Sequence, residues 1–398
     1  MEKKDIEEAA VRIKDYIKRT DVIESTTINE VCGCRVFLKM ENFQRTGSFK
    51  LRGAANRLLT LKEEEKERGI ITASTGNHGQ AVAYMAKILG IECKIIVPKN
   101  VKKSKIDAIR RYGVKSEVYG NNYDDAFQRS GELAKEEGYV MINSYEDEEI
   151  IAGNGTISLE MPELDTLIVP VGGGGLLTGM LIALEGKSTK VMGVEPEGAA
   201  CMHLSLKNGR PSSTPVVDTI ADGLAAKHPG IKPFNIIKGR LSENDLLLVN
   251  DKEIASTVLF LLERRKILAE PSGVAALAAL MYHKVEVRSD MRVGVLITGG
   301  NMELSDLSYL IERNTANEGR RVRLWILIND RPESMKDVFD ILGKNGLISE
   351  NVFLDRHAHS VPMGYCELRI VATANQSAMV EKCTGELRER GYRVTVAY

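Results

Sequence analysis

The sequence predicts an α/β protein whose strands form mostly parallel sheets, followed by a smaller C-terminal domain. Short apolar runs, β-branched and nearly uncharged, alternate with helical stretches through most of the chain. Strands that alternate with helices at this spacing form parallel sheets with right-handed crossovers. Several runs end in turns rich in glycine and hydroxyl residues, and such sheets bind ligands beyond the carboxyl ends of their strands. We therefore look for functional residues in those turns.

Five apolar runs are predicted to be buried strands because they combine β-branched residues with almost no charge. They are residues 70–73, 94–98, 167–171, 190–195 and 293–299. Segments with a helical pattern lie between them, for example residues 79–90 and 102–113.

The pattern changes around residues 314–319, Asn-Thr-Ala-Asn-Glu-Gly. The tail that follows predicts a compact βαββαβ unit. RRVRLWILI is a strand, PESMKDVFDILGKNG a helix, SVPMGYCELRIVATA a strand, QSAMVEKCTGELRERG a second helix and YRVTVAY the closing strand.

Charge and composition exclude some classes of partner. Lys and Arg total 54 against 55 Asp and Glu, so the net charge gives no electrostatic case for nucleic acid or an anionic membrane. Residues 1–19 predict an amphipathic helix rather than a signal peptide. Residues 166–184 carry no charge and are long enough for a membrane span, but Pro170 and four glycines favour a strand, a loop and a helix.

The cysteines indicate a reducing compartment, and we expect a cytoplasmic protein. The chain is too long to need disulfides for stability, and Cys32-x-Cys34 lacks the second pair of ligands that a metal site would require. The six cysteines are Cys32, Cys34, Cys93, Cys201, Cys366 and Cys383.

The stretch Thr46-Gly47-Ser48-Phe49-Lys50 places a lysine between Phe49 and Leu51 where a helix begins. The ordinary pKa of a lysine is ~10.4, and partial burial favours the neutral amine that covalent chemistry needs. A surface lysine that extends its amine into water is the alternative.

The stretch of residues 73–80, ASTGNHGQ, lies between a predicted strand and a helix. Its backbone N–H groups and small polar side chains favour a carboxylate or phosphate at the helix N-terminus. A capped helix with a tight turn is the alternative. His78 suits a structural role better than that of a base.

Four glycines, Gly172 to Gly175, precede Leu176 at the start of another predicted helix. Without Cβ atoms, successive N–H groups can face a phosphate. The stretch lacks the G-x-x-x-x-G-K-[ST] pattern, so a P-loop nucleotide site is not supported.

Two further turns are weaker signals. Thr298-Gly299-Gly300-Asn301 ends a strand, and the Thr298 hydroxyl could make one directed hydrogen bond to a heterocycle. Glu270-Pro271-Ser272-Gly273 is a turn at a helix start. Either could be a turn and nothing more.

Together these stretches offer a covalent amine, two anion sites and a hydroxyl directed at a ring, all of which pyridoxal phosphate would use. The chain resembles the fold type II pyridoxal-phosphate enzymes, in their threonine dehydratase (threonine ammonia-lyase) branch, over about residues 5–315. SFKLRGA, STGNHGQA, VGGGGL and TGGN occur in the order of that family. SFK followed by x-R-G indicates dehydratases and serine racemases within it.

The resemblance implies a fold and a role for each stretch. Residues 1–316 would form the catalytic domain, two open twisted sheets with a smaller subdomain of about residues 50–150 inserted in the larger. Lys50 would hold the cofactor covalently and later act as general base. The other cofactor contacts would be Phe49, Asn77, Gly172, Gly173, Gly174, Gly175, Leu176 and Thr298. The substrate carboxylate would bind Ser74, Thr75, Gly76 and Asn77.

The implied reaction is deamination of L-threonine to 2-ketobutyrate and ammonia by β-elimination of water, with L-serine as a second substrate. A serine racemase or another lyase of β-hydroxyamino acids is the nearest alternative. A non-catalytic amino-acid sensor is a more distant one.

A metal site is the feature in which the chain departs from related enzymes. Eukaryotic serine racemases bind a divalent cation through two carboxylates in the stretch that corresponds to residues 195–201. Glu195 matches the first carboxylate, but Cys201 stands at the second. A monovalent cation near Glu195 and the carbonyl of Ala199 remains a candidate, and a plain turn is the alternative.

Residues 320–398 resemble a ferredoxin-like ACT domain, a module that commonly binds small effectors and pairs with another copy. The resemblance implies an enzyme regulated by an effector such as isoleucine, and a homodimer or homotetramer. A tail that only assembles the oligomer is the alternative.

Overall fold

The computed structural model describes residues 1–74, 76–99, 101–317 and 319–397. The chain divides into two compact units, Met1–Glu303 and Leu304–Tyr398. We describe each unit by itself.

The first unit contains a six-stranded sheet in the order β1-β2-β10-β7-β8-β9. All neighbouring strands run parallel except β1, which is antiparallel to β2. The strands are β1 (Val22–Glu24), β2 (Arg35–Met40), β7 (Thr166–Pro170), β8 (Lys190–Pro196), β9 (Leu246–Val249) and β10 (Arg292–Ile297).

A second, smaller sheet in this unit has the order β5-β4-β3-β6, and all its strands run parallel. They are β3 (Ile70–Ala73), β4 (Cys93–Val97), β5 (Lys115–Val118) and β6 (Val140–Met141). The five strands predicted from apolar runs are thus confirmed to within one or two residues, as β3, β4, β7, β8 and β10.

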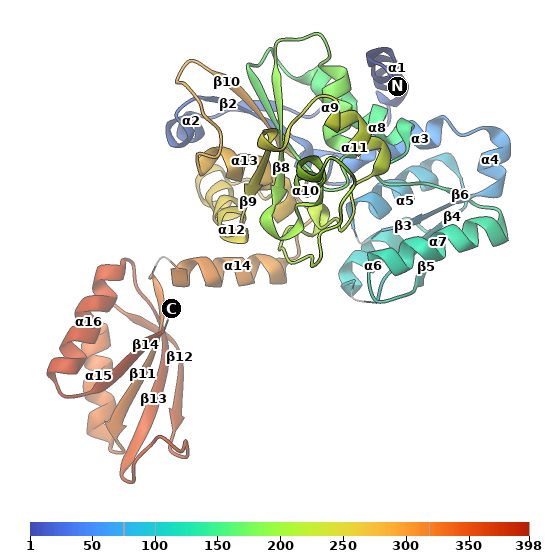
Figure 1. Cartoon of the computed structure of the whole chain (residues 1–398). Coiled ribbons are helices and arrows are strands. Elements are labelled where there is room, and N and C mark those ends of the chain that lie inside the picture. Colours follow the sequence, from blue (N-terminus) through green and yellow to red (C-terminus); the bar gives the residue numbers. More distant parts are fainter. Residues whose placement is uncertain (75, 100, 318, 398) are drawn as a thin grey trace. The chain divides into compact units, whose positions relative to one another are not determined.

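Helices cover both faces of the smaller sheet, because its side chains alternate between the faces. Ile70 and Ile95 pack with α3 and α5. Ile71 and Ile96 face the other way and pack with α7. Figure 1 shows α7 running along this sheet. The helices of the first unit are α1 (Lys3–Ile13), α2 (Thr26–Cys32), α3 (Lys50–Leu59), α4 (Glu63–Arg68), α5 (Asn77–Leu89), α6 (Lys103–Arg110), α7 (Tyr123–Glu137), α8 (Glu148–Gly155), α9 (Gly175–Ala183), α10 (Cys201–Asn208), α11 (Ile231–Lys238), α12 (Asp251–Phe260) and α13 (Pro271–Met281).

Short helical turns complete the first unit. They are η1 (Glu41–Phe43), η2 (Thr156–Glu160), η3 (Glu197–Ala199), η4 (Asp222–Leu224), η5 (Glu243–Asp245) and the π-helical η6 (Leu261–Arg265). The uncharged stretch considered above as a membrane span forms β7, the glycine loop and α9. Among the described residues, no helix is long and apolar enough to cross a membrane.

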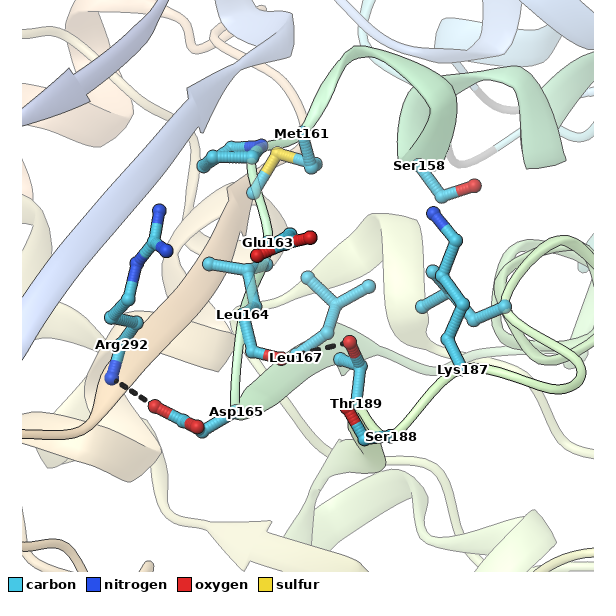
Figure 2. Close-up of a pocket in the computed structure, with 12 residues that line it drawn as sticks. Ser158, Met161, Glu163, Leu164, Asp165, Leu167, Lys187, Ser188, Thr189 and Arg292 are labelled. Atoms are coloured by element: carbon cyan, nitrogen blue, oxygen red, sulfur yellow. Dashed lines mark hydrogen bonds between the residues drawn. The ribbon is translucent and has the colours of Figure 1, made fainter.

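One ligand-sized pocket lies away from the carboxyl ends of the strands. A pocket of about 390 Å³ lies where β7, β8 and β10 begin, and it is lined by the loops that precede β7 and β8 (Figure 2).

The second unit follows the predicted βαββαβ order after a leading helix, α14 (Leu304–Asn317). Its antiparallel sheet has the order β12-β13-β11-β14. The elements are β11 (Arg321–Asn329), α15 (Pro332–Lys344), β12 (Ile348–Asp355), β13 (Tyr365–Thr373), α16 (Ser377–Glu389) and β14 (Arg393–Ala397).

β12 is the one strand of this sheet for which the prediction named no segment, because its sequence signals are weak. Most of its side chains are exposed, so it lacks a clear alternation of apolar and polar residues. On β11, by contrast, Val322, Leu324, Ile326 and Ile328 are buried in alternation with more exposed neighbours, and they form the core with α15 and α16.

Candidate active site

The segment before Lys50 pairs with the end of β10. Ser48 forms an antiparallel bridge with Gly299, and Phe49 donates its backbone N–H to the carbonyl of Thr298 at 3.0 Å. A Cβ on Gly47, which has a φ of +74°, would lie 2.2 Å from Oδ1 of Asn301, so this position requires glycine. Lys50 therefore starts α3 from a backbone fixed against the carboxyl end of the larger sheet.

Lys50 is half-buried, as its position between two large apolar residues predicts. Its Nζ lies 3.4 Å from the carbonyl oxygen of Ser144 and 5.1 Å from the centre of the Phe49 ring. Burial lowers the pKa of Lys50 to about 8, although the nearby carboxyl of Glu270 acts in the opposite direction. Roughly a tenth of this amine is therefore neutral at pH 7, far more than for an ordinary lysine, and the neutral form is the one that nucleophilic or basic chemistry requires.

A chain of side-chain hydrogen bonds joins the start of α5 to the larger sheet. Asn77 Nδ2 donates to Glu270 Oε1 at 2.6 Å, and Asn301 Nδ2 donates to Asn77 Oδ1 at 2.8 Å and to the carbonyl of Thr46 at 2.8 Å. Burial raises the pKa of Glu270 to about 7, and the charge of Asp222 adds to the effect. The sequence placed Glu270 only in a turn, whereas the structure brings it into the site.

The predicted carboxylate-binding turn lies at the N-terminus of α5. Ser74 Oγ accepts hydrogen bonds from the backbone N–H groups of Gly76 at 3.1 Å and Gly79 at 2.8 Å, so its first role is to cap this helix. Apart from its two chain neighbours, no described residue has an atom within 4 Å of a Cβ built on Gly76, so the turn borders open space. Thr75, which is also predicted to bind the substrate carboxylate, lies outside the described residues.

His78 is buried next to this turn. Neither ring nitrogen has a hydrogen-bond partner of good geometry among the residues that the structure describes. Burial, and secondarily the charge of Lys50, lower the pKa of His78 to about 3. The ring is neutral at physiological pH and, with so low a pKa, is a weak base.

The glycine loop connects β7 to α9 and packs against Tyr145. A Cβ on Gly173 would lie 2.5 Å from the Tyr145 ring, and one on Gly175 would lie 2.9 Å from the Tyr145 carbonyl oxygen. Gly174 has a φ of +96°, a conformation that favours glycine. Leu176, in the first turn of α9, packs its side chain into the core, so only its backbone can serve a ligand. The loop therefore ends at a helix N-terminus, where unpaired N–H groups favour an anion.

Thr298, predicted to face a ring, lies at the carboxyl end of β10 and is almost fully buried. Its Oγ1 donates to the carbonyl of Ser272 at 3.4 Å. Ser272 Oγ in turn accepts from the N–H of Gly223 at 2.8 Å. The start of α13 thus supports the end of β10.

The candidate cation region is a helix cap. Glu195, buried at the end of β8, accepts hydrogen bonds from the backbone N–H groups of Met202 at 2.8 Å and His203 at 2.6 Å. Burial raises the pKa of Glu195 to about 8, although these hydrogen bonds lower it. Ala199 and Cys201 are buried beside it. No group of three metal-ligating side chains occurs in the described part of the chain, and the monovalent cation stays a prediction.

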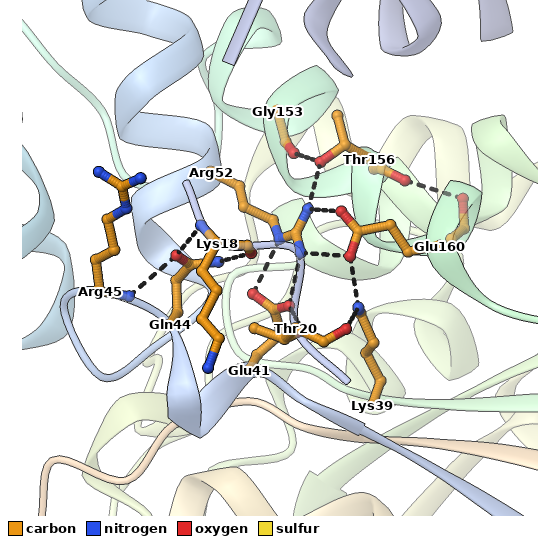
Figure 3. A network of polar contacts seen from close by, with 12 residues as sticks. Lys18, Thr20, Lys39, Glu41, Gln44, Arg45, Arg52, Gly153, Thr156 and Glu160 are labelled. Carbon is orange, nitrogen blue, oxygen red and sulfur yellow. Dashed lines mark hydrogen bonds and ion pairs between the residues drawn. The ribbon is translucent and has the colours of Figure 1, made fainter. Parts of the chain in front are cut away.

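Arg52, in the same motif as Lys50, is the centre of a buried ion network (Figure 3). Its guanidinium donates to both oxygens of Glu41 at 2.8 and 2.9 Å and to both oxygens of Glu160 at 2.7 and 2.9 Å. Lys39 donates to Glu160 at 2.5 Å and to the carbonyl of Thr20 at 2.6 Å. The network connects the first turn of α3 to β2 and η2. In the sequence, only the x-R-G pattern after Lys50 indicated a role for Arg52.

The residues present fit the expected cofactor, a phosphorylated aldehyde. Lys50 supplies an amine with a lowered pKa, and the glycine loop leaves no room for a Cβ at several positions. Thr46 Oγ1 and Ser48 Oγ, close to Lys50 in sequence, are buried without hydrogen-bond partners among the described residues. Such atoms are normally paired, so two unpaired ones in the segment that leads to Lys50 indicate a site built for a polar ligand.

Comparisons with known proteins agree with this geometry. The family described as pyridoxal-phosphate dependent enzyme matches residues 13–299. An L-threonine ammonia-lyase of Thermotoga maritima is 36% identical over 98% of both chains. A catabolic L-threonine dehydratase, TdcB, of Staphylococcus aureus is 39% identical over 77% of this chain and 91% of its own. Among solved structures, maize serine racemase superposes with a TM-score of 0.73 at 33% identity, covering 79% of this chain and 98% of its own.

Proposed function

Because the chain belongs to the family of pyridoxal-phosphate dependent enzymes, we propose that it deaminates L-threonine to 2-ketobutyrate and ammonia, with L-serine as a second substrate. One observation carries the proposal: a relative named L-threonine ammonia-lyase matches 98% of this chain, which includes both compact units. In the reaction, the substrate loses its α-proton and its β-hydroxyl as water. Hydrolysis of the resulting enamine then consumes one water and releases ammonia.

Lys50 is the catalytic residue of this proposal. When bound, pyridoxal phosphate supplies an electron sink for the negative charge left at Cα. Lys50 would hold the cofactor through its amine and, once displaced by the substrate amine, would remove the α-proton as general base. Its pKa of about 8 allows it to accept a proton and to give it up again near neutral pH.

The other site residues position the reactants. The backbone of residues 172–176 would hold the phosphate, and Phe49 would pack against the ring. Asn77 and Thr298 would contact polar groups of the ring. The turn of residues 74–77 would bind the substrate carboxylate at the N-terminus of α5, with Ser74 keeping the turn in shape through its cap.

The C-terminal unit is proposed to be a ferredoxin-like ACT domain that binds an effector such as isoleucine. The βαββαβ order and the sheet order β12-β13-β11-β14 support this assignment. Binding there would shift the catalytic unit between two states of different activity.

Release of 2-keto acid from L-threonine and from L-serine, with and without isoleucine, tests the proposal. We expect faster release from L-threonine, suppression by isoleucine, and loss of the suppression in a chain that ends at Glu303. Full isoleucine sensitivity in the shortened chain would contradict regulation through the C-terminal unit. Release of no keto acid from either substrate would contradict the lyase.

Serine racemase is the second candidate, favoured by the superposition on maize serine racemase. The buried Cys201 at the position of the second metal carboxylate argues against a divalent cation of the kind expected there. Formation of D-serine from L-serine in excess of pyruvate would favour the racemase. A chain with neither activity and no covalently held cofactor would favour a non-catalytic sensor.

A further inference from the structure

The pocket at the amino ends of β7, β8 and β10 lies at the opposite end of the larger sheet from Lys50. β10 begins at Arg292, which lines the pocket (Figure 2). The same strand ends beside Thr298, which belongs to the candidate active site. The pocket has a volume of about 390 Å³, within the range of small-molecule sites. A ligand bound here would therefore occupy a site separate from that of the substrate.

The walls of this pocket are held together by backbone hydrogen bonds. Asp165 connects three strands: its N–H donates to the Arg292 carbonyl at 2.9 Å, its carbonyl accepts from Lys190 N at 2.9 Å, and its carboxylate accepts from Arg292 N at 2.7 Å. Thr189 Oγ1 donates to the carbonyl of Leu164 at 2.8 Å and so joins the loops before β7 and β8. These hydrogen bonds fix the walls of the pocket relative to one another.

Charges of both signs line the pocket. Among the described residues, the side chains of Lys187, Glu163 and Arg292 form no ion pair, although the Arg292 guanidinium lies over the Phe37 ring, 5.4 Å from its centre. The buried Nε of Arg292 has no hydrogen-bond partner in the part of the chain that the structure describes. Glu24 is close enough to feel the charge of Arg292, but its carboxylate already binds Arg35 at 3.0 Å.

The formal charges of the pocket sum to zero. Lys187 and Arg292 contribute two positive charges, and Glu163 and Asp165 contribute two negative charges. An anion or a cation alone would satisfy one sign and leave the other, whereas a neutral ligand with separated charges can pair with both. The apolar part of the lining consists of the largely buried Leu164, Leu167 and Leu184 and the more exposed Met161 and Pro162.

We propose that this pocket binds a small zwitterion, an α-amino acid with an aliphatic side chain. Its carboxylate would pair with Lys187 and Arg292, its ammonium with Glu163 and Asp165, and its side chain would lie on the apolar part of the lining, chiefly Met161 and Pro162. The site is additional to any effector site of the C-terminal unit, and it does not depend on the proposed reaction.

Calorimetric titration of the full-length holoenzyme with L-leucine tests the proposal. L-Leucine has no β-hydroxyl to eliminate. Prior reduction of the bond between Lys50 and the cofactor with borohydride prevents the amine of L-leucine from displacing Lys50. Only this reduction rests on the proposed function. We expect the parent to bind one equivalent of L-leucine per chain at this pocket. Lys187→Glu and Glu163→Lys should lose this binding, or bind L-leucine at least tenfold more weakly. Both side chains are exposed, so both variants should fold, which circular dichroism checks.

Matched controls make the result specific. Lys207→Glu and Glu286→Lys reverse charges at exposed positions outside the pocket and should leave the titration unchanged. 4-Methylpentanoate lacks the amine of leucine, and 3-methylbutylamine lacks its carboxylate, so neither should match its affinity. The proposal is overturned if L-leucine gives no binding, if both pocket variants bind it like the parent, or if 4-methylpentanoate binds as tightly.

Discussion

Asn77 and Glu270, 193 residues apart in the chain, share a hydrogen bond of 2.6 Å between Nδ2 and Oε1. Asn77 begins α5 beside the smaller sheet, and Glu270 precedes α13 beside the larger one. The bond therefore holds the two sheets together next to Lys50, and the site exists only while both of its halves are in place.

The raised pKa of Glu270 predicts a pH-dependent contribution to stability. Burial raises this pKa from 4.5 to about 7. Folding therefore favours the protonated carboxyl, a contribution that is full below the unfolded pKa and is lost as the pH rises through about 7. Relative to Glu270→Gln, the parent should lose stability between pH 5 and pH 8, by at most on the order of 3 kcal/mol.

Urea unfolding of the parent and Glu270→Gln at several pH values measures this difference. Groups remote from Glu270 titrate alike in both proteins. Lys50, whose pKa the charge of Glu270 raises, titrates at about 8, so subtraction below pH 7 isolates Glu270. Glu286→Gln, at an exposed position, is the control and should follow the parent. Parallel curves for parent and Glu270→Gln would show that Glu270 does not titrate in this range.

Lys50 should set the pH dependence of covalent cofactor uptake. The amine reacts when neutral, and its pKa is lowered to about 8 from 10.5, so uptake should rise with pH and reach half its maximum near pH 8. Absorbance of the covalent complex, followed after adding pyridoxal phosphate to the apoenzyme, measures this. Lys50→Ala should form no such complex and release no keto acid, whereas the exposed Lys87→Ala should behave like the parent. A midpoint near pH 10.5 would contradict the burial argument.

Gly173→Ala should weaken cofactor binding. The added Cβ would lie 2.5 Å from the Tyr145 ring, so the glycine loop or Tyr145 must move. Overpacking of this kind typically costs about 1–3 kcal/mol, which corresponds to roughly a 5- to 150-fold rise in Kd if the strain falls on the bound state. Fluorescence titration of the apoenzyme with pyridoxal phosphate gives the value. Gly131→Ala, on α7 with 3.9 Å of clearance, is the matched control, and equal Kd values for the two variants would refute the proposed cradle.

The sequence was most informative where a strand ends in a turn with an unusual composition. Lys50, the glycine loop and Thr298 lie at the carboxyl ends of strands, as an α/β pattern requires, and β7 and β10 start within one residue of their predicted bounds. Tyr145 was not foreseen, because its role depends on the approach of a loop after β6 to glycines 28 and 30 residues away. A short polar side chain at a helix start, such as Ser74, can bind a ligand or cap the helix, and the sequence does not distinguish the two roles.

The network around Arg52 shows why the rest was not predictable from sequence. Glu160 lies 108 residues from Arg52, and no local pattern distinguishes it from a surface glutamate. Burial raises the pKa of Glu160, but its hydrogen bonds and charge interactions with Arg52 and Lys39 outweigh this, and the pKa is lowered. Tertiary contacts, rather than local composition, thus determine which charges are buried.

Removal of Arg52 should destabilise the catalytic unit strongly. Replacing a whole buried ion network by apolar residues can leave the stability unchanged. Arg52→Met, however, removes only one cation and leaves the carboxylates of Glu41 and Glu160 with only Lys39 to compensate their charge. Loss of one partner from a buried pair typically costs about 3–5 kcal/mol, and we expect a loss of that size in the free energy of unfolding. Arg52→Lys keeps the charge without the two-pronged geometry and should lose less.

Urea unfolding followed by circular dichroism provides the comparison, with Arg240→Met as the surface control. Arg240 pairs with Glu185 at 3.4 Å on the surface, where such pairs contribute at most about 1 kcal/mol. Because Arg52 also fixes the first turn of α3, Arg52→Lys should bind pyridoxal phosphate more weakly even under conditions where it stays folded. If Arg52→Met were as stable as Arg240→Met, the carboxylates would have to take up protons or rearrange toward water. In that case the network would not be what holds Lys50 in position.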